Sequence, residues 1–215
     1  MTKLKTISGK IINHDESFYG EITFNENIKN IERNNETENE NIIIPGFLDL
    51  HCHGGNGYDV MDGVDAIKSM SSYHLSKGTT SLLATTMTND FENTFKALKD
   101  FNLNFKNKNT NLVGVHLEGP FINPSKLGAQ PPLSAEPSID FVRKIKKIAD
   151  VKVITIAPEL NNMDALIEYL IQENIKIQIG HSLASYDCCK KLINKTDIGF
   201  THLYNAMSGS DHRKP

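Results

Sequence analysis

Five residues in this sequence carry side chains suited to binding a metal ion. They lie at or just after the ends of short apolar runs, in the segments IIIPGFLDLHCHG, NLVGVHLEGPF, IKIQIGHS and DIGFTHLYNAM. The residues are His51, His53, Glu118, His181 and His202. Imidazole and carboxylate are the usual protein ligands of zinc and iron, and a barrel assembles such ligands from the ends of different strands. We therefore expect the five to form one metal site.

The HxH pair gives the first part of this prediction. His51 and His53 are two residues apart, so on a strand both imidazoles face the same way and can bind one ion. Cys52 then faces the opposite side and is expected to be buried. Asp49 shares the parity of the two histidines and is expected to orient a ligand. An HxH pair is common by chance, so its weight comes from the other motifs.

The motif HLEGPF gives the second part. A glutamate at the end of an apolar strand needs a partner for its charge, and a cation bound by Glu118 supplies one. His116 is either a group near the ligands or substrate, or a hydrogen-bonded core histidine. His14 and His74 are expected to be surface residues. Arg213 either clamps a phosphate through its planar fork or is a solvated loop charge.

These residue types indicate metal-assisted hydrolysis. A bound divalent ion lowers the pKa of water from 15.7 towards about 7 and polarises a carbonyl group. A carboxylate would then carry a proton to the leaving group. The sequence offers no candidate for that carboxylate, which is expected on a strand beyond residue 215. The proline-rich loop PFINPSKLGAQPP is expected to form a wall of the substrate site.

The elements that must position these residues alternate between strands and helices from residue 42 onward. Strands are predicted at 42–50, 79–86, 111–118, 151–159, 175–182 and 198–203. Helices with apolar residues three and four apart are predicted at 63–78, 89–103, 138–150, 162–174 and 185–195. Such apolar strands indicate a parallel sheet covered on both faces. No GxGxxG follows a strand, and the polar strand ends favour a barrel over an open doubly wound sheet.

The predicted fold is therefore an α/β, incomplete (β/α)8 TIM-type barrel of about six βα units over residues 42–215. Residues 1–41 form a small amino-terminal β-domain with short antiparallel strands, in which KNIERNNETENEN is expected to be a solvated loop. A complete barrel has eight strands and about 250 residues. We therefore expect the 215 residues to be the amino-terminal fragment of a longer protein.

Composition narrows the class of protein. The chain is 39% hydrophobic and 23% charged, with a net charge of −3 and no basic block, which gives no case for nucleic acid or an anionic membrane. The amino terminus lacks the apolar stretch of a signal peptide, and no run is long enough to span a bilayer. The odd cysteine count of three suits a reducing compartment, so a cytoplasmic location is expected.

The motifs PGFLDLHCHG, GVHLEGPFINPSKLGAQPP, IAPE, GHSLAS and THLYNAMSG, in this order, closely resemble the N-acetylglucosamine-6-phosphate deacetylase family of the amidohydrolase superfamily. The resemblance runs from about Pro45 to Pro215. Related amidohydrolases such as dihydroorotase use a carboxylated lysine on the fourth strand. Here that strand ends in APE, and Glu118 takes the ligand role.

The resemblance implies a role for each candidate residue. Glu118, His181 and His202 would hold the main ion, and His51 and His53 a second, so that one or two divalent ions (zinc, iron or manganese) bind per chain. Substrate contacts are implied for Ala129, Gln130, Asn205 and Ala206, with Arg213 on the phosphate. The catalytic aspartate would follow residue 215, and the full-length protein would be a homodimer.

The implied function is removal of acetate from N-acetylglucosamine 6-phosphate to give glucosamine 6-phosphate in amino-sugar catabolism. Two alternatives stay open. One is a hydrolase for a different substrate, namely a deacetylase for N-acetylgalactosamine 6-phosphate or another cyclic-amide amidohydrolase. The other is a truncated product that binds metal or sugar phosphate without turnover.

Overall fold

The structure is a computed structural model that describes residues 3–34, 40–106, 110–210 and 212–213. The chain divides into two compact units, Met1–Phe47 and Leu48–Pro215. The sequence placed the division at 41/42. Residues 42–43 belong with the first unit because they pair with its first strand.

The first unit is a four-stranded sheet. Its strands, in the order β3-β2-β1-β4, are β1 (Lys5–Ile12), β2 (Ser17–Phe24), β3 (Ile28–Arg33) and β4 (Ile42–Ile43). The first three are antiparallel, and β4 joins β1 in parallel. The prediction of a solvated loop from residue 29 was wrong as far as residue 33. All residues of β3 are exposed, so this edge strand is held by its backbone hydrogen bonds to β2. Its polar composition is therefore not that of a typical strand and did not predict one. Residues 35–39 lie outside the described part of the chain.

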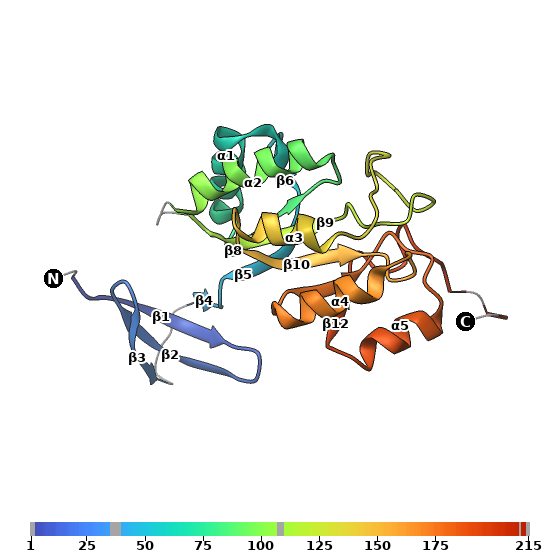
Figure 1. The fold of residues 1–215 in the computed structure, drawn as a ribbon. Coiled ribbons are helices and arrows are strands. Elements are labelled where there is room, and N and C mark those ends of the chain that lie inside the picture. The colour runs from blue at the N-terminus through green and yellow to red at the C-terminus, as the bar shows by residue number, and fades with distance from the viewer. Residues whose placement is uncertain (1–2, 35–39, 107–109, 211, 214–215) are drawn as a thin grey trace. The chain divides into compact units, whose positions relative to one another are not determined.

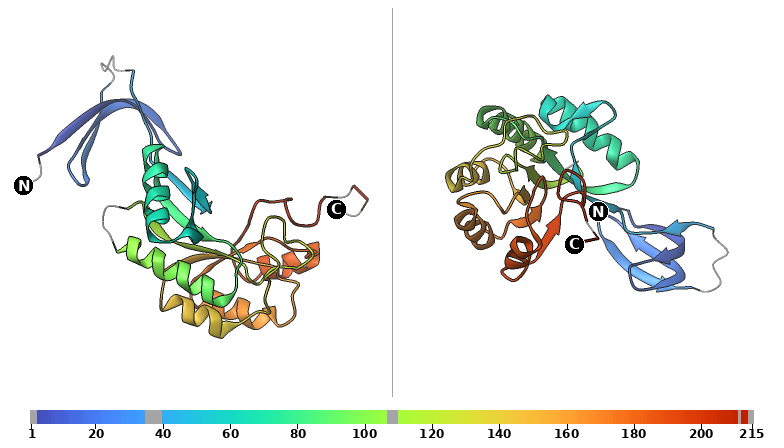
Figure 2. Two further views of the ribbon diagram at one scale, coloured as in Figure 1. Left: turned by 90° about the horizontal axis from the view of Figure 1, so that it is seen from above. Right: turned by 90° about the vertical axis from the view of Figure 1, so that its right-hand side faces the viewer.

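The second unit is built on a curled six-stranded sheet, shown in Figures 1 and 2. Its order is β12-β11-β10-β9-β8-β5. The strands are β5 (Phe47–Cys52), β8 (Thr79–Thr86), β9 (Leu112–Glu118), β10 (Val151–Ile156), β11 (Lys176–Ile179) and β12 (Ile198–Phe200). The pairs from β8 to β12 are parallel. Strands that follow one another in the sequence are neighbours in the sheet. Because these strands run parallel, their carboxyl ends lie at one edge. This arrangement confirms the barrel-type prediction.

In the described part of the chain, five α-helices follow the strands and lie on the outer side of the curled sheet (Figure 2). They are α1 (Val64–Ser76), α2 (Phe91–Phe105), α3 (Ile139–Lys146), α4 (Met163–Gln172) and α5 (Tyr186–Ile193). Each lies within or close to its predicted range. Apolar residues of these helices pack against the strands in one core that includes Phe101, Phe141, Ile154 and Ile167.

Local chemistry fixes where several helices begin. The side chains of Asp90, Ser138 and Ser185 accept hydrogen bonds from the backbone N–H groups of Asn93, Phe141 and Cys188 at the starts of α2, α3 and α5. A capping residue of this kind stabilises a helix by about 1 kcal/mol. The helices therefore start at set distances from the strand ends, which fixes the length of the loops that carry the site.

The segment between β5 and α1 contains elements that the sequence did not predict. A short hairpin, β6 (Gly54–Gly55) and β7 (Tyr58–Asp59), precedes a 3₁₀-helix, η1 (Val60–Asp62). Here the prediction that His74 is a surface residue was wrong. Its Nε2 lies 3.1 Å from the Gly54 carbonyl oxygen and 3.2 Å from Cys52 Sγ, so α1 fixes the turn after His53. Cys52 is buried, as predicted.

A row of polar side chains crosses the inner face of the curled sheet. His116 Nε2 lies 2.7 Å from Thr155 Oγ1, which lies 2.7 Å from Thr201 Oγ1. Thr201 in turn bonds to Gln178 at 2.7 Å. These residues come from β9, β10, β11 and the end of β12, so the row ties together the strands that carry the candidate ligands.

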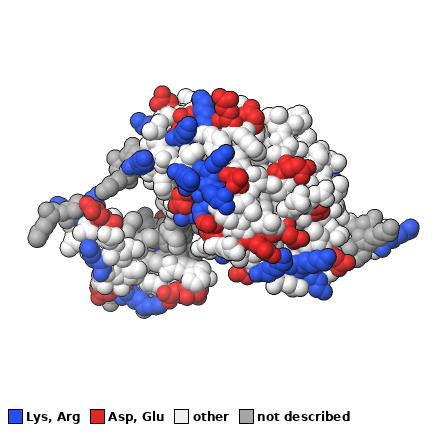
Figure 3. Space-filling model, viewed as in Figure 1, with Lys and Arg blue, Asp and Glu red and all other residues white. Residues whose placement is uncertain are grey.

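The surface carries charges of both signs. Figure 3 shows acidic and basic side chains interspersed on the face drawn, and pairs such as Lys96–Asp100 (3.1 Å) and Lys152–Asp150 (2.8 Å) join them. Within the described residues, every helix is too short or too polar to cross a membrane.

Candidate metal centre

The five predicted ligands occupy one edge of the sheet. His51 lies on β5 and His53 follows that strand, while Glu118 is the last residue of β9. His181 and His202 come shortly after β11 and β12. The structure thus brings together residues that are up to 151 positions apart (202 − 51) in the sequence. Their common origin at the carboxyl ends of parallel strands is the reason.

Backbone conformation directs two of these side chains inward. His181 has φ 49° and His202 has φ 35°, in the left-handed region that residues other than glycine rarely adopt. Such conformations cost free energy and persist at functional sites. Both histidines leave their strand by a sharp turn, which brings the imidazoles back over the strand ends.

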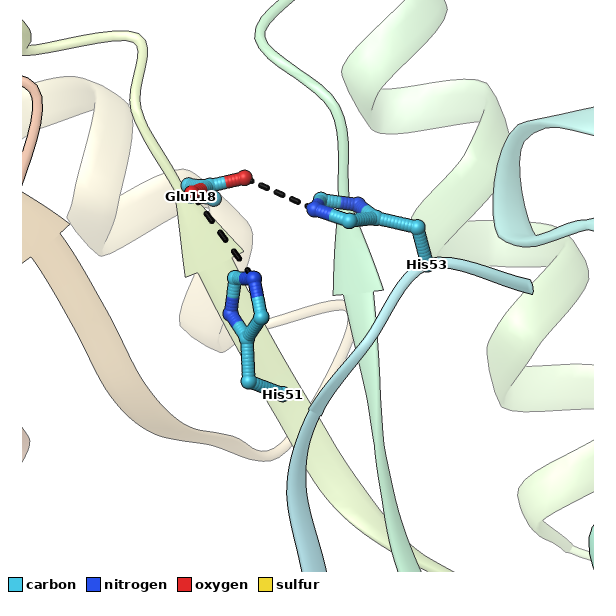
Figure 4. Close-up of side chains that lie close together, drawn as sticks. All are labelled: His51, His53 and Glu118. Atoms are coloured by element: carbon cyan, nitrogen blue, oxygen red, sulfur yellow. Dashed lines mark ion pairs between the residues drawn. The ribbon is translucent and has the colours of Figure 1, made fainter. Parts of the chain in front are cut away.

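Glu118 lies at the centre of the cluster. Its Oε1 is 3.0 Å from His181 Nε2 and 3.1 Å from His202 Nε2. His53 Nε2 lies 2.8 Å from Oε2, and His51 Nε2 lies 3.9 Å from Oε1. Figure 4 shows both of these imidazoles directed at the carboxylate. In each of two groups, Glu118 with His51 and His53 and Glu118 with His181 and His202, the ligand atoms lie within 4.8 Å of one another. One carboxylate is therefore shared by two candidate ion sites.

Backbone carbonyl groups hold three of the imidazoles. His181 Nδ1 lies 2.8 Å from the Lys126 carbonyl oxygen, and His53 Nδ1 lies 3.1 Å from the Thr85 carbonyl oxygen. In His202, Nδ1 lies 3.0 Å from the Asn205 oxygen. A carbonyl oxygen only accepts, so each Nδ1 carries the hydrogen and donates it. Each Nε2 that faces Glu118 is then, in the neutral imidazole, a bare lone pair.

This arrangement requires positive charge between the rings and the carboxylate. A lone pair on Nε2 and a lone pair on a carboxylate oxygen repel each other at 2.8–3.1 Å. Either the imidazoles take up a second proton or a cation lies between the two groups. Neutral imidazole nitrogen and carboxylate oxygen together are the donor set of zinc and of similar divalent ions. The residues present therefore fit a divalent metal ion.

The pKa shifts follow from the same contacts. Burial lowers the pKa of His53 and of His181, but the hydrogen bond to Glu118, the charge of Glu118 and a bond to a backbone carbonyl group together outweigh burial and leave both pKa values raised. Burial alone would raise the pKa of Glu118, yet its bonds to His181 and His53 hold that pKa well below its ordinary value. For His51 burial dominates and lowers the pKa. Glu118 thus stays ionised and attracts protons or a metal ion.

Exposure shows how an ion or substrate reaches the centre. The side chains of Glu118 and His181 are 1% and 3% exposed, whereas those of His51, His53 and His202 are 30%, 27% and 31% exposed. The carboxylate therefore lies at the bottom, and the partly exposed rings form the rim on the solvent side.

His116 and Asp49 support the ligands from behind. His116 is fully buried, and its Nδ1 donates to the Leu50 carbonyl oxygen at 2.8 Å. It is thus a hydrogen-bonded core histidine that also lies next to a candidate ligand, and burial lowers its pKa to about 4. The same Nδ1 lies 3.4 Å from His51 Nδ1. Asp49 accepts the backbone N–H of His51 at 3.0 Å. Asp49 thus orients the residue that carries the ligand, in line with the prediction.

The loop after β9 lies against the centre, but its two predicted substrate residues differ in position. Ala129 is exposed, whereas Gln130 is buried and bonds to the side chain of Glu118. Lys126 Nζ donates to the Met207 carbonyl oxygen at 3.1 Å, which links this loop to the one that follows His202. The loop is therefore held at two places: Gln130 bonds to Glu118, and Lys126 bonds to the loop that follows His202.

The remaining predicted substrate residues follow His202. Asn205 is exposed, and its backbone N–H donates to the His202 carbonyl oxygen at 2.9 Å. Ala206 has φ 51° and is partly buried. Arg213 lies in an exposed bend at 212–213, eleven positions (213 − 202) beyond His202 in the sequence.

Two residues with contacts at or near the centre, Glu159 and Thr88, were not predicted from the sequence. Glu159, after β10, accepts hydrogen bonds from Asn123 Nδ2 and the Leu183 backbone N–H at 2.9 and 2.6 Å. Thr88 donates its hydroxyl hydrogen to the Glu118 carbonyl oxygen at 3.1 Å. The position of Glu159 at a strand end, in IAPE, was a usable signal for its role. The backbone N–H of Thr88 also donates to Gln130 Oε1 at 2.7 Å. A backbone contact of this kind cannot be recognised from the type of the residue.

Comparison with known proteins places this centre in a family. Residues 42–214 match the model of the amidohydrolase family. The N-acetylglucosamine-6-phosphate deacetylase of Bacillus subtilis (strain 168) is 36% identical over 185 residues, which cover 82% of this chain and 47% of the relative. The N-acetylgalactosamine-6-phosphate deacetylase of Escherichia coli O157:H7 is 31% identical over 81% of this chain and 48% of its own length.

A solved structure agrees with these matches. The N-acetylglucosamine-6-phosphate deacetylase of Thermotoga maritima superposes with a TM-score of 0.87 at 30% identity, over 98% of this chain and 58% of that chain. The present chain spans about half the length of the curated relatives it matches. The family model covers most of the chain and contains all five candidate ligands, so the chain belongs to the amidohydrolase family.

Proposed function

We propose that this protein takes part in the metal-dependent removal of acetate from N-acetylglucosamine 6-phosphate, which gives glucosamine 6-phosphate and acetate. The observation that carries the proposal is the set of Nε2 atoms that converge on both oxygens of the buried Glu118. The reactions named for the relatives from B. subtilis and T. maritima supply the substrate class.

Each ligand residue has a role in the proposal. Glu118, His181 and His202 hold the main ion, and His51 and His53 hold a second ion that shares Glu118. Zinc, iron and manganese all suit these donors. When bound, a divalent ion supplies Lewis acidity towards the acetyl carbonyl and lowers the pKa of water.

The chain's own residues prepare the site for this chemistry. The carbonyl groups that accept from Nδ1 of His53, His181 and His202 keep the three Nε2 atoms free of hydrogen. The burial of Glu118 keeps its charge away from water, which strengthens its interaction with cations. The exposed residues Ala129 and Asn205, with Ala206, are proposed to contact the sugar.

Two further roles complete the reaction. The guanidinium fork of Arg213 is proposed to bind the phosphate group. An acid–base aspartate expected after residue 215 would protonate the leaving amine. Acetate release is therefore a prediction for the longer protein, whereas metal binding is a prediction for this chain. The homodimer stays a prediction, and the free cysteines fit the proposed cytoplasmic location.

Metal analysis tests the centre. Protein purified without added ions is stripped with a chelator, reloaded with Zn²⁺ or Mn²⁺, and assayed for metal content. We expect two ions per chain in the unaltered protein and loss of the main ion in His202→Asn. The matched control is His14→Asn, since His14 is exposed and belongs to the other compact unit, outside the one that carries the five candidate ligands. Unaltered protein that binds no metal would contradict the proposed centre.

Acetate release tests the reaction. The longer, metal-loaded protein is given N-acetylglucosamine 6-phosphate and, separately, its galactosamine epimer. We expect faster acetate release from the glucosamine compound. Faster release from the epimer would favour the activity named for the E. coli relative. Metal binding without release from either compound would favour a protein that binds sugar phosphate without turnover.

A further inference from the structure

Gln130 makes two hydrogen bonds that fix its side-chain amide. Its Oε1 accepts the backbone N–H of Thr88 at 2.7 Å, and its Nε2 donates to Glu118 Oε2. A backbone N–H can only donate, so the oxygen of the amide must face Thr88. The NH₂ group must then face Glu118. The orientation of the amide follows from chemistry and has no flipped alternative.

The position of Gln130 favours contact with the carboxylate over contact with substrate. The residue is 6% exposed, while its neighbour Ala129 is exposed. Its backbone N–H closes a turn onto the Leu127 carbonyl oxygen at 2.8 Å. This turn follows Lys126, whose carbonyl oxygen accepts from His181. One short loop therefore sets the orientation of two candidate ligands.

Glu118 needs such a partner because its terminal torsion is soft. The carboxylate plane of a glutamate rotates over a broad range. To be shared by two ions it must present Oε1 to His181 and His202 and Oε2 to His53. The hydrogen bond from Gln130 uses one lone pair of Oε2 and leaves another free for an ion. Without that bond, the carboxylate can turn and give both oxygens to one ion.

We infer that Gln130 is a positioning residue that holds Glu118 in the orientation that bridges two metal ions. This inference rests on the proposed metal centre. It assigns Gln130 to the carboxylate, where the family resemblance implies a contact to substrate. Partners of metal-bound carboxylates contribute about 10- to 100-fold to metal affinity. The contribution falls on the second ion, because Gln130 bonds to the oxygen that faces His53.

The test compares Gln130→Met with the unaltered protein. Methionine has a similar length but can neither accept from Thr88 nor donate to Glu118. Asn111→Leu is the matched control, because Asn111 is a buried amide near the start of β9, at the other end from Glu118, and bonds to Ser71 and the Thr79 backbone. Co²⁺ binding is followed by calorimetry and by the visible absorption of the bound ion, and circular dichroism confirms folding.

We expect the unaltered protein and Asn111→Leu each to bind two Co²⁺ ions, with the same two affinities in both proteins. Gln130→Met should keep the first ion and bind the second about 10- to 100-fold more weakly, with a changed Co²⁺ spectrum. If Gln130→Met does not fold, Gln130→Asn is read in the same way, because its shorter amide cannot reach both partners.

The possible failures can be told apart. Unaltered protein that binds no Co²⁺ overturns both the proposed centre and this inference. Unaltered protein that binds one ion leaves the main site intact and overturns the bridging role. Two ions bound with unchanged affinity in Gln130→Met overturn the inference alone. An equal loss in Asn111→Leu shows a general effect of a lost buried amide, and it also overturns the inference.

Discussion

Ser182, which directly follows His181 in the chain, donates its hydroxyl hydrogen to Glu159 Oε2 at 2.6 Å. Glu159 Oε1 accepts from the Leu183 backbone and from Asn123 Nδ2 as well. One carboxylate at the end of β10 therefore ties the loop after β9 to the loop after β11. These are the loops that carry Gln130 and His181.

The first prediction concerns Glu159→Ala. The change leaves the Leu183 N–H and the Ser182 and Asn123 side chains without this acceptor, so we expect the free energy of unfolding to fall by about 1–3 kcal/mol. Hydrogen exchange at the Leu183 amide should also become faster. Urea unfolding and amide exchange measure the two effects.

The control for Glu159→Ala is Glu168→Ala on α4. Glu168 is 65% exposed and lies 3.7 Å from Lys195, an exposed pair with little effect on stability. We expect a change within about 0.5 kcal/mol. Equal losses in the two variants would show that Glu159 does not hold the loops.

The second prediction concerns metal removal. A ligand that binds the folded state alone stabilises it by about 2.7 kcal/mol when present at 100 times its dissociation constant. We expect Zn²⁺ to raise the thermal unfolding midpoint and a chelator to reverse this. In His181→Asn the shift should be largely lost, because one of the Nε2 atoms next to Glu118 Oε1 is gone. A full shift in this variant, matching that of His14→Asn, would place the stabilising ion elsewhere.

The third prediction concerns pH. Burial lowers the pKa of His116 to about 4, while a histidine in the unfolded chain has a pKa of about 6.5. Between these values the unfolded chain binds a proton that the folded chain does not, so the free energy of unfolding falls as the pH falls. The loss from His116 is roughly 2 kcal/mol between about pH 7 and pH 5.

The matched variant for this pH dependence is His116→Gln, measured by urea unfolding in the presence of a chelator. His53 and His181 have raised pKa values, so their contributions are lost as the pH rises and oppose that of His116. His51 has a lowered pKa and acts in the same direction as His116. The difference between the unaltered protein and His116→Gln isolates His116. Identical slopes in the two proteins would contradict the assignment.

The fourth prediction concerns the residue before His181. A Cβ on Gly180 would lie 2.7 Å from Thr155 Cγ2 and 2.8 Å from Thr201 Cβ. Gly180→Ala must therefore force β10 and the end of β12 apart. We expect a loss of about 1–3 kcal/mol in the free energy of unfolding and weaker metal binding, because His181 directly follows Gly180 and His202 directly follows Thr201.

Gly209→Ala is the control for this prediction, since its Cβ would meet nothing within 4 Å. Both variants are measured by urea unfolding and by Zn²⁺ titration. If Gly180→Ala is as stable and binds Zn²⁺ as tightly as Gly209→Ala, the close packing beneath His181 has no role in the centre.

Much of the second unit could be predicted from residue pattern. The alternation of apolar runs with helical periodicity gave the six strands and five helices, because a parallel sheet covered by helices needs that pattern. The placement of Glu118 and the four histidines followed, because strand ends of such a sheet meet at one edge. The family motifs added the expectation that Glu118, His181 and His202 hold a main ion and that His51 and His53 hold a second one.

Other features could not be predicted because they depend on tertiary contacts. Strand β3 has exposed side chains and a polar composition, and only its ladder to β2 makes it a strand. His74 looks like a helix-surface residue until the turn after β5 packs against it. The sequence predicts a substrate wall for the loop that carries Gln130, and the burial of Gln130 depends on a turn that places it against Glu118.

The imidazoles of His53, His181 and His202 are oriented by the carbonyl groups of Thr85, Lys126 and Asn205. A main-chain carbonyl is the same whichever side chain the residue carries. The anchors themselves therefore do not depend on side-chain type, and sequence comparison across relatives would register the ligands but not the carbonyl groups that orient them. Engineering the centre thus means preserving the path of the backbone at these positions as well as the ligands themselves.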